Sequence, residues 1–116
     1  MYIDHNWYTL RFKPGLIDES DPVTSLDVAA LQSLVLAPLL GIKDPRTDSR
    51  IAFVGGVKGS AELERRVNSG EMAVAFELYP VSVQDIMDVA DAGMIMPPKS
   101  TWFEPKLGSG WFVHEF

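Results

Sequence analysis

The sequence contains no cysteine, which excludes disulfide bonds, thiolate metal sites and cysteine nucleophiles. It also lacks an uninterrupted apolar run of the roughly 18 residues that a membrane-spanning helix needs. The longest candidate, residues 28–42, is broken by polar side chains, Pro38 and Gly41. Residues 1–6 carry no basic patch followed by an apolar stretch, so they do not indicate a secretory signal. We therefore expect a cytoplasmic protein with no membrane partner.

Basic residues are scarce and scattered. Ten Lys and Arg stand among sixteen Asp and Glu, which gives a net charge of −6. A nucleic-acid surface needs clustered Lys and Arg, so we expect no nucleic-acid partner. The two histidines, His5 and His114, have no partner at a metal-ligand spacing, and no GxSxG nucleophile motif occurs. The chain therefore carries neither a metal motif nor an assembled catalytic set.

What is present is the composition of one ordinary globular domain, residues 1–116. Apolar, β-branched and aromatic segments bounded by Gly, Pro and polar residues predict strands at 7–12, 51–54, 72–78, 100–104 and 111–115. The predicted fold class is α/β (α+β), in the order β-α-β-α-β-α-β-β. Because 51–54 and 72–78 flank a helix, they predict a central βαβ unit in a mixed sheet, and the last two strands predict a C-terminal β-hairpin.

Three helices are expected between the strands. The first begins near Thr24 or Ser25, and Pro38 ends or kinks it. Ser60 is the predicted cap of the second helix, which stops at Asn68-Ser69-Gly70. The third helix has the clearest signals: Ser82 and Asp85 form a capping box, and Ala92-Gly93 closes the helix. Its apolar residues Val83, Ile86, Met87 and Ala90 share one face, and Asp88 and Asp91 lie on the outer face.

A glycine-rich segment precedes the second helix. In Val54-Gly55-Gly56-Val57-Lys58-Gly59-Ser60, glycines let backbone amides converge, and a helix N-terminus attracts anions. Gly55, Gly56, Lys58 and Gly59 are therefore candidate anion-binding residues. The segment matches neither the Walker pattern nor the dinucleotide fingerprint, so an ordinary tight turn is the favoured interpretation.

A second candidate site is residues 96–106, MPPKSTWFEPK. The proline pair restricts the backbone, so the residues after it are presented with little entropy left to lose on binding. A small anionic metabolite or a nucleotide could meet positive charge and hydroxyl groups there. The alternative interpretation is structural, because a proline pair before an aromatic strand is also an ordinary entry into a sheet.

MPPKSTWFEPK, together with residues 7–14, 26–42, 50–56 and 83–93, resembles the family called domain of unknown function 1015. The resemblance implies that this chain is the C-terminal part of a longer protein. It implies an upstream DGHHR-type segment, absent here, and an upstream region similar to ParB-like proteins, some of which are nucleotide-dependent serine kinases. The signature residues carried over as a ligand site are Lys99, Ser100, Thr101, Trp102 and Lys106. Gly108 departs from the pattern, which expects a larger residue there.

Two functions follow as hypotheses. In the first, the chain is an accessory domain that completes a small-molecule or nucleotide site with an upstream domain of the same protein. The full-length protein would then catalyse phosphoryl transfer linked to serine metabolism, and this fragment would have no activity of its own. In the second, the chain is a structural or protein–protein interaction module without a ligand. Exposed aromatic residues such as Trp102 and Trp111 would mark its interface, and pairing with a second copy would follow from an exposed apolar patch.

Overall fold

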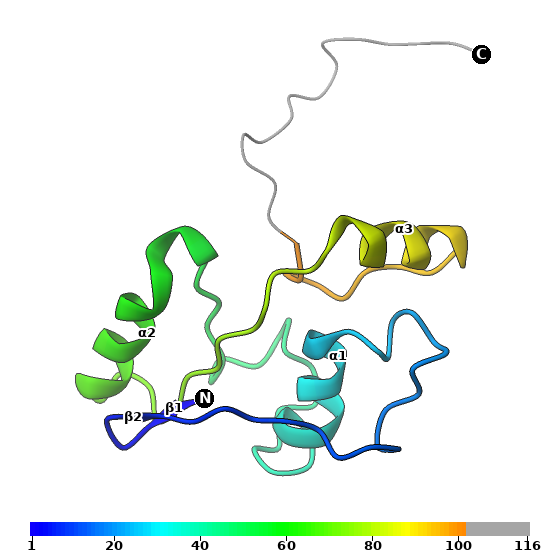
Figure 1. Ribbon diagram of the computed structural model, residues 1–116. Coiled ribbons are helices and arrows are strands. Elements are labelled where there is room, and N and C mark those ends of the chain that lie inside the picture. The colour runs from blue at the N-terminus through cyan, green and yellow to red at the C-terminus, as the bar shows by residue number, and fades with distance from the viewer. Residues whose placement is uncertain (102–116) are drawn as a thin grey trace, which may run out of the picture.

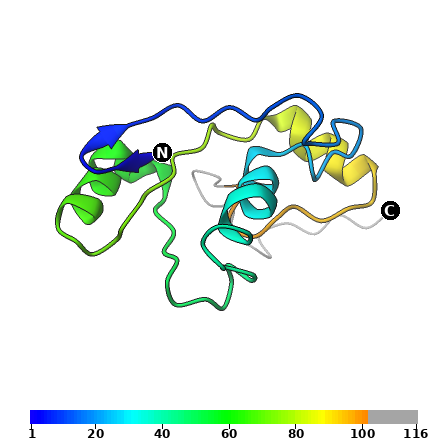
Figure 2. The ribbon, with the colours of Figure 1, turned by 90° about the horizontal axis from the view of Figure 1, so that it is seen from below.

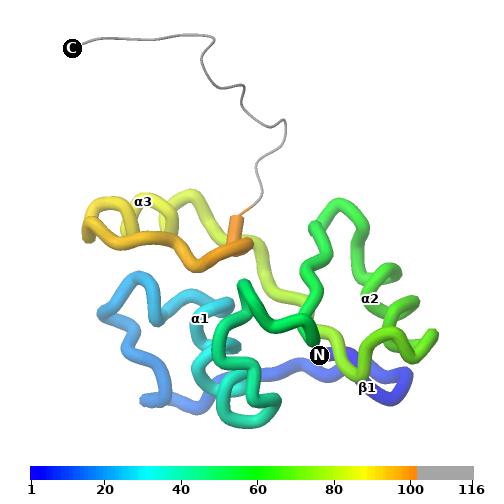
Figure 3. Tube along the Cα trace, turned by 180° about the vertical axis from the view of Figure 1, so that it is seen from behind, coloured from blue at the N-terminus to red at the C-terminus, as the bar shows by residue number. Residues whose placement is uncertain are grey.

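The computed structural model describes residues 1–101 as three short helices and one small β-hairpin (Figure 1). The elements are β1 (Tyr2–Ile3), β2 (Asn6–Trp7), α1 (Asp27–Leu31), the π-helical turn η1 (Gln32–Leu36), the 3-10 turn η2 (Gly56–Lys58), α2 (Gly59–Asn68) and α3 (Val83–Asp91). The hairpin and α2 form one end of the molecule, and α1 and α3 form the other (Figure 3). Long segments without regular structure join the two ends (Figure 2).

The hairpin is a two-stranded antiparallel unit in which Tyr2 faces Trp7 and Ile3 faces Asn6. Its turn residues, Asp4 and His5, have φ values of 48° and 61°. Positive φ at both central residues is the requirement of a type I′ turn, whose twist matches that of the paired strands. The Tyr2 and Trp7 rings lie 5.0 Å apart on one face, which adds a favourable aromatic pair to the short ladder.

The hairpin is held against α2 and the chain that follows it. Tyr2 exchanges two backbone hydrogen bonds with Ala75, of 2.8 and 3.0 Å. The Tyr2 hydroxyl donates to Asn68 Oδ1 at 3.0 Å, and Trp7 Nε1 donates to Glu64 Oε1 at 2.7 Å. A two-stranded hairpin alone is only marginally stable in water, so these contacts are what keep this end of the molecule ordered.

Pro38 determines how the first helix ends, as the sequence predicts. Proline has no N–H to donate and its ring crowds the preceding turn. The chain responds with a wider turn, in which the Ala37 amide donates to Gln32 O at 3.0 Å. The amide of Ile42 then donates back to Leu36 O at 2.8 Å, which folds the chain onto the helix. The resulting core contains Leu31, Leu36 and Ile42, against which Val35, Ile51 and Phe76 pack.

The predicted α/β fold with a mixed sheet and a central βαβ unit is wrong. The only sheet within residues 1–101 is the hairpin, and no ladder joins 51–54 to 72–78. Residues 72–78 instead meet Tyr2 through the single antiparallel bridge at Ala75. A parallel pair must be covered on both faces, yet Phe53 is 48% and Leu78 is 40% exposed. Ile51 and Phe76 are the residues of these two segments that pack against this core cluster, and Ala75 is buried where it pairs with Tyr2.

The predicted strand at 7–12 is also wrong over most of its length. Of these residues only Trp7 belongs to a strand, and Tyr8 adds hydrogen bonds to Met1 at the mouth of the hairpin. The predicted C-terminal hairpin, 100–104 with 111–115, lies outside the described residues except for Ser100 and Thr101. None of the helices within residues 1–101 has the length and apolar character to cross a membrane.

The predicted caps have mixed outcomes. The capping box of α3 is confirmed, with Asp85 N donating to Ser82 Oγ at 3.0 Å and Ser82 N donating to Asp85 Oδ2 at 2.8 Å. The Thr24 or Ser25 cap is wrong, because α1 begins after Leu26. The Ser60 cap is wrong as well, because α2 already begins at Gly59.

Candidate functional site

Residues Pro97 to Ser100 form a tight turn that presents Lys99. The Ser100 amide donates to Pro97 O at 3.4 Å, and its hydroxyl donates to the same oxygen at 2.6 Å. Lys99 has a φ of 62° and an exposed side chain. Proline at the second position and positive φ at the third are the features of a type II turn, which normally places glycine or asparagine where Lys99 stands. The turn therefore stores backbone strain at a solvent-facing cation.

The side chains around Lys99 differ in what they can offer a ligand. Within residues 1–101 Lys99 forms no ion pair, so its charge is available to an anion. The Ser100 hydroxyl already donates its hydrogen bond to Pro97 O. Its oxygen can therefore accept a hydrogen bond from a ligand, but the hydroxyl does not donate to a ligand in this arrangement. Thr101 is exposed. Trp102 and Lys106 lie outside the described residues.

The glycine-rich segment forms η2 and the start of α2. Lys58 N donates to Gly55 O at 3.0 Å, and Gly59 has a φ of 66°. No strand leads directly into this turn, so it lacks the strand-to-helix setting on which the anion-binding interpretation depends. Val57 is 80% exposed and Gly56 is open to solvent, which leaves a shallow turn and no cradle.

The structure does not join the two predicted sites. In the described part of the chain, no hydrogen bond or ion pair connects residues 55–59 with residues 99–101. Nor do residues 1–101 contain a group of three or more His, Asp or Glu side chains placed to hold a metal ion. Lys58 lies on η2 and Lys99 on the turn from Pro97 to Ser100, and both side chains are exposed.

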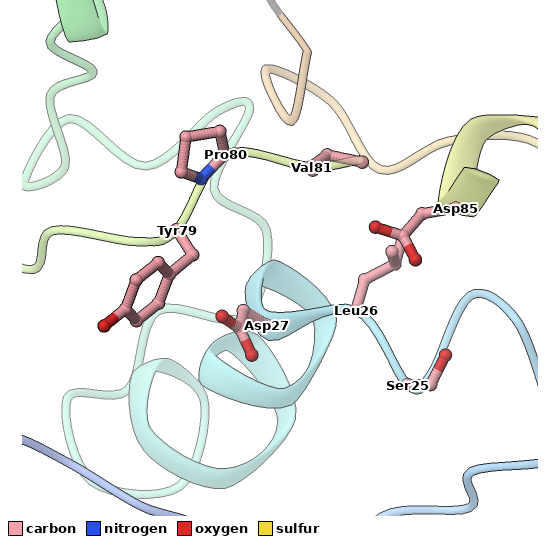
Figure 4. A pocket seen from close by; sticks show the side chains of 7 residues that line it. All are labelled: Ser25, Leu26, Asp27, Tyr79, Pro80, Val81 and Asp85. Atoms are coloured by element: carbon pink, nitrogen blue, oxygen red, sulfur yellow. The ribbon is translucent and has the colours of Figure 1, made fainter. Parts of the chain in front are cut away.

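A hollow of about 280 Å³ lies elsewhere, between the start of α1, the segment before α3 and the first turn of α3 (Figure 4). Its lining consists of Ser25, Leu26, Asp27, Tyr79, Pro80, Val81 and Asp85. The carboxylates of Asp27 and Asp85 lie on either side of Leu26, and the Tyr79 ring extends away from Asp85 (Figure 4). None of the residues predicted to bind a ligand lines this hollow.

The electrostatics of the hollow oppose an anionic ligand. Hydrogen bonds with the side chain and backbone amide of Ser82 hold the pKa of Asp85 below its ordinary value, so the carboxylate is charged at neutral pH. Asp27 brings a second carboxylate, and no Lys or Arg lines the hollow. Phosphates and nucleotides would therefore meet repulsion there. Asp85 already serves as the capping residue of α3, which accounts for its presence without a ligand.

The predicted apolar face of α3 is only partly buried. The core covers Val89, which is 1% exposed, whereas Val83 is 72% and Met87 is 52% exposed. Ala90 is exposed too. Ile86, the fourth residue of the predicted face, is half-buried, so Val83, Met87 and Ala90 form the exposed part of that face. We call these three residues the α3 stripe.

The surroundings of α3 explain why the stripe is uncovered. In residues 1–101, no Cα of α3 lies within 8 Å of another helix or strand. Figure 1 shows the helix at the margin of the molecule. Comparison of the chain with models of protein families, with curated proteins and with solved structures finds no match. The family resemblance therefore stays a prediction.

Proposed function

We propose that this chain is an accessory interaction domain of the cytoplasm, which acts by docking the α3 stripe against another protein surface. The single observation that carries the proposal is the exposure of Val83 and Met87, at 72% and 52%, on a regular helix with well-formed ends. Val89 of the same helix is 1% exposed, so one face of α3 packs against the rest of this chain. The separate apolar face that carries Val83 and Met87 is left for another protein.

The ends of α3 show that the helix does not depend on a partner for its boundaries. The capping box satisfies its first amides, and Gly93, with a φ of 66°, ends it. The Gly93 amide donates to Ala90 O at 2.9 Å and the Met94 amide to Val89 O at 3.0 Å, which is the Schellman pattern. A preformed helix loses little entropy on binding, which favours recognition by a helix face.

The proposal is tested with a photo-crosslinking amino acid placed at position 87 in the full chain in intact cells. We expect one discrete protein adduct that disappears when Val83→Glu is added. The matched control places the same amino acid at position 57, where Val57 is 80% exposed but lies on η2. Equal labelling at positions 57 and 87, or no adduct at either, would contradict the proposal.

A second candidate function, contact with an anionic metabolite or nucleotide, has one observation in its favour. Lys99 stands in a left-handed conformation and forms no ion pair within residues 1–101. Strained residues concentrate at binding sites because the surrounding structure must hold them in place. Thermal-shift measurements with nucleotides, serine and phosphorylated metabolites test it. A shift that Lys99→Ala removes would support this function, and the absence of any shift would argue against it.

A further inference from the structure

The charges beside the α3 stripe restrict what can cover it. With about 3.6 residues per helical turn, Asp91 falls beside Met87, four positions earlier, on the side away from the buried Val89, and Asp88 lies further around the helix, next to Asp91. Both carboxylates are exposed, and α3 contains no Lys or Arg. Gln84 Nε2 donates to Asp88 Oδ1 at 2.7 Å and steadies that carboxylate on the surface. The stripe therefore has an acidic margin.

The helix dipole does not explain this margin. Asp88 and Asp91 lie in the C-terminal half of α3, where the helix dipole favours positive charge. A carboxylate in the last turn costs roughly 0.3–1 kcal/mol at an exposed position. Neither Asp88 nor Asp91 forms an ion pair within residues 1–101. Their position is instead suited to a cationic group brought by a partner.

We propose that the α3 stripe docks an amphipathic helix of a partner protein whose apolar seam is flanked by Lys or Arg. This inference rests on the proposed interaction function and adds the chemistry of the partner. Apolar residues of the partner helix pack on Val83, Met87 and Ala90, while its basic residues reach Asp88 and Asp91 at the rim.

Two other occupants fit less well. A second copy of the chain would bring the same acidic margin to the contact, and each chain carries a net charge of −6. An anionic membrane surface is repelled by the same carboxylates. Opposite charge on the partner removes the repulsion and raises the association rate.

The test titrates the full chain into a fluorescent helical peptide built from Leu and Lys, with a Leu–Glu peptide of the same length and apolar pattern as the comparison. We expect binding to the Leu–Lys peptide that weakens at high salt. Met87→Glu should weaken it at least about tenfold, and Asp88→Asn with Asp91→Asn about fivefold, with most of the salt dependence lost. Val57→Glu adds the same charge at an exposed apolar position elsewhere and should reduce binding much less.

The possible results separate this inference from the proposed function. Equal binding of both peptides, sensitive to Met87→Glu, would overturn the basic partner and leave an apolar interaction face. Self-association that Met87→Glu abolishes, without peptide binding, would assign the stripe to a second copy and also overturn the basic partner. If neither Met87→Glu nor the Asp88 and Asp91 changes affect binding of the Leu–Lys peptide, the peptide binds elsewhere on this acidic chain. That result would overturn the inference. No binding and no self-association would overturn it as well.

Discussion

Replacing Val89 with alanine is expected to destabilise the fold more than the same replacement at Val83, six positions earlier along α3. The two valines differ mainly in burial, since Val89 is 1% and Val83 is 72% exposed. Comparing the two substitutions therefore tests which face of α3 is buried against the rest of the chain. The comparison also tests whether the α3 stripe, on which the interaction proposal depends, is exposed to solvent.

The magnitude follows from the atoms removed. Val→Ala deletes two methyl groups, and about 0.8 kcal/mol for each buried carbon gives about 1.6 kcal/mol, to which the remaining cavity adds. The higher helix propensity of alanine returns up to about 0.7 kcal/mol in a helix interior. We expect Val89→Ala to lower the free energy of unfolding by about 1–2 kcal/mol. Val83→Ala should change it by no more than about 0.5 kcal/mol, as an exposed substitution does.

Urea denaturation followed by circular dichroism measures both free energies of unfolding, and equal m-values would show that the unfolding transitions are comparable. A larger loss for Val83→Ala than for Val89→Ala would mean that the predicted apolar face is the buried one. Equal losses would mean that α3 is not docked through Val89. Either result would refute the assignment of the stripe as a free surface.

Three further predictions concern local structure. Ser82→Ala should lower the free energy of unfolding by about 1 kcal/mol in urea denaturation, because it removes the cap of α3, and Ser82→Asn should restore most of it. Lys99→Gly should stabilise the chain or leave it unchanged, and Lys99→Val should destabilise it by about 1–2 kcal/mol in thermal unfolding, because φ is positive there. Hydrogen bonds from Arg65 and Arg66 lower the pKa of Glu62 from 4.5 to about 2, so its contribution to stability is complete above pH 4.5 and is lost as the pH falls toward 2. Glu62→Gln should flatten that part of a pH titration of stability, and an unchanged profile would contradict the role of this ion pair.

The family resemblance and the ligand residues illustrate how far sequence patterns reach for the candidate site. The motif around Lys99 singled out a turn that is unusual in the structure, because a lysine occupies a left-handed position. The sequence motif could not show that the Ser100 hydroxyl donates its hydrogen bond to Pro97 O. Nor could it show that residues 55–59 lack the preceding strand that an anion-binding loop needs. The hydrogen bond joins residues only three positions apart, whereas the missing strand reflects that residues 51–54 find no partner strand in the described chain.

The sequence by itself determined the features that act over a few residues. Ser82 with Asp85 began α3, Gly93 ended it, and Pro38 directly follows the C-cap residue of η1, because capping and ring sterics involve only the neighbouring turn. Only the tertiary structure decided that residues 51–54 and 72–78 do not pair. It also decided that the rest of the molecule buries the Val89 side of α3 and leaves Val83 exposed. Strand pairing and burial depend on which distant segment of the chain packs against a given segment. Apolar residues show that a partner is needed, but their periodicity does not identify it.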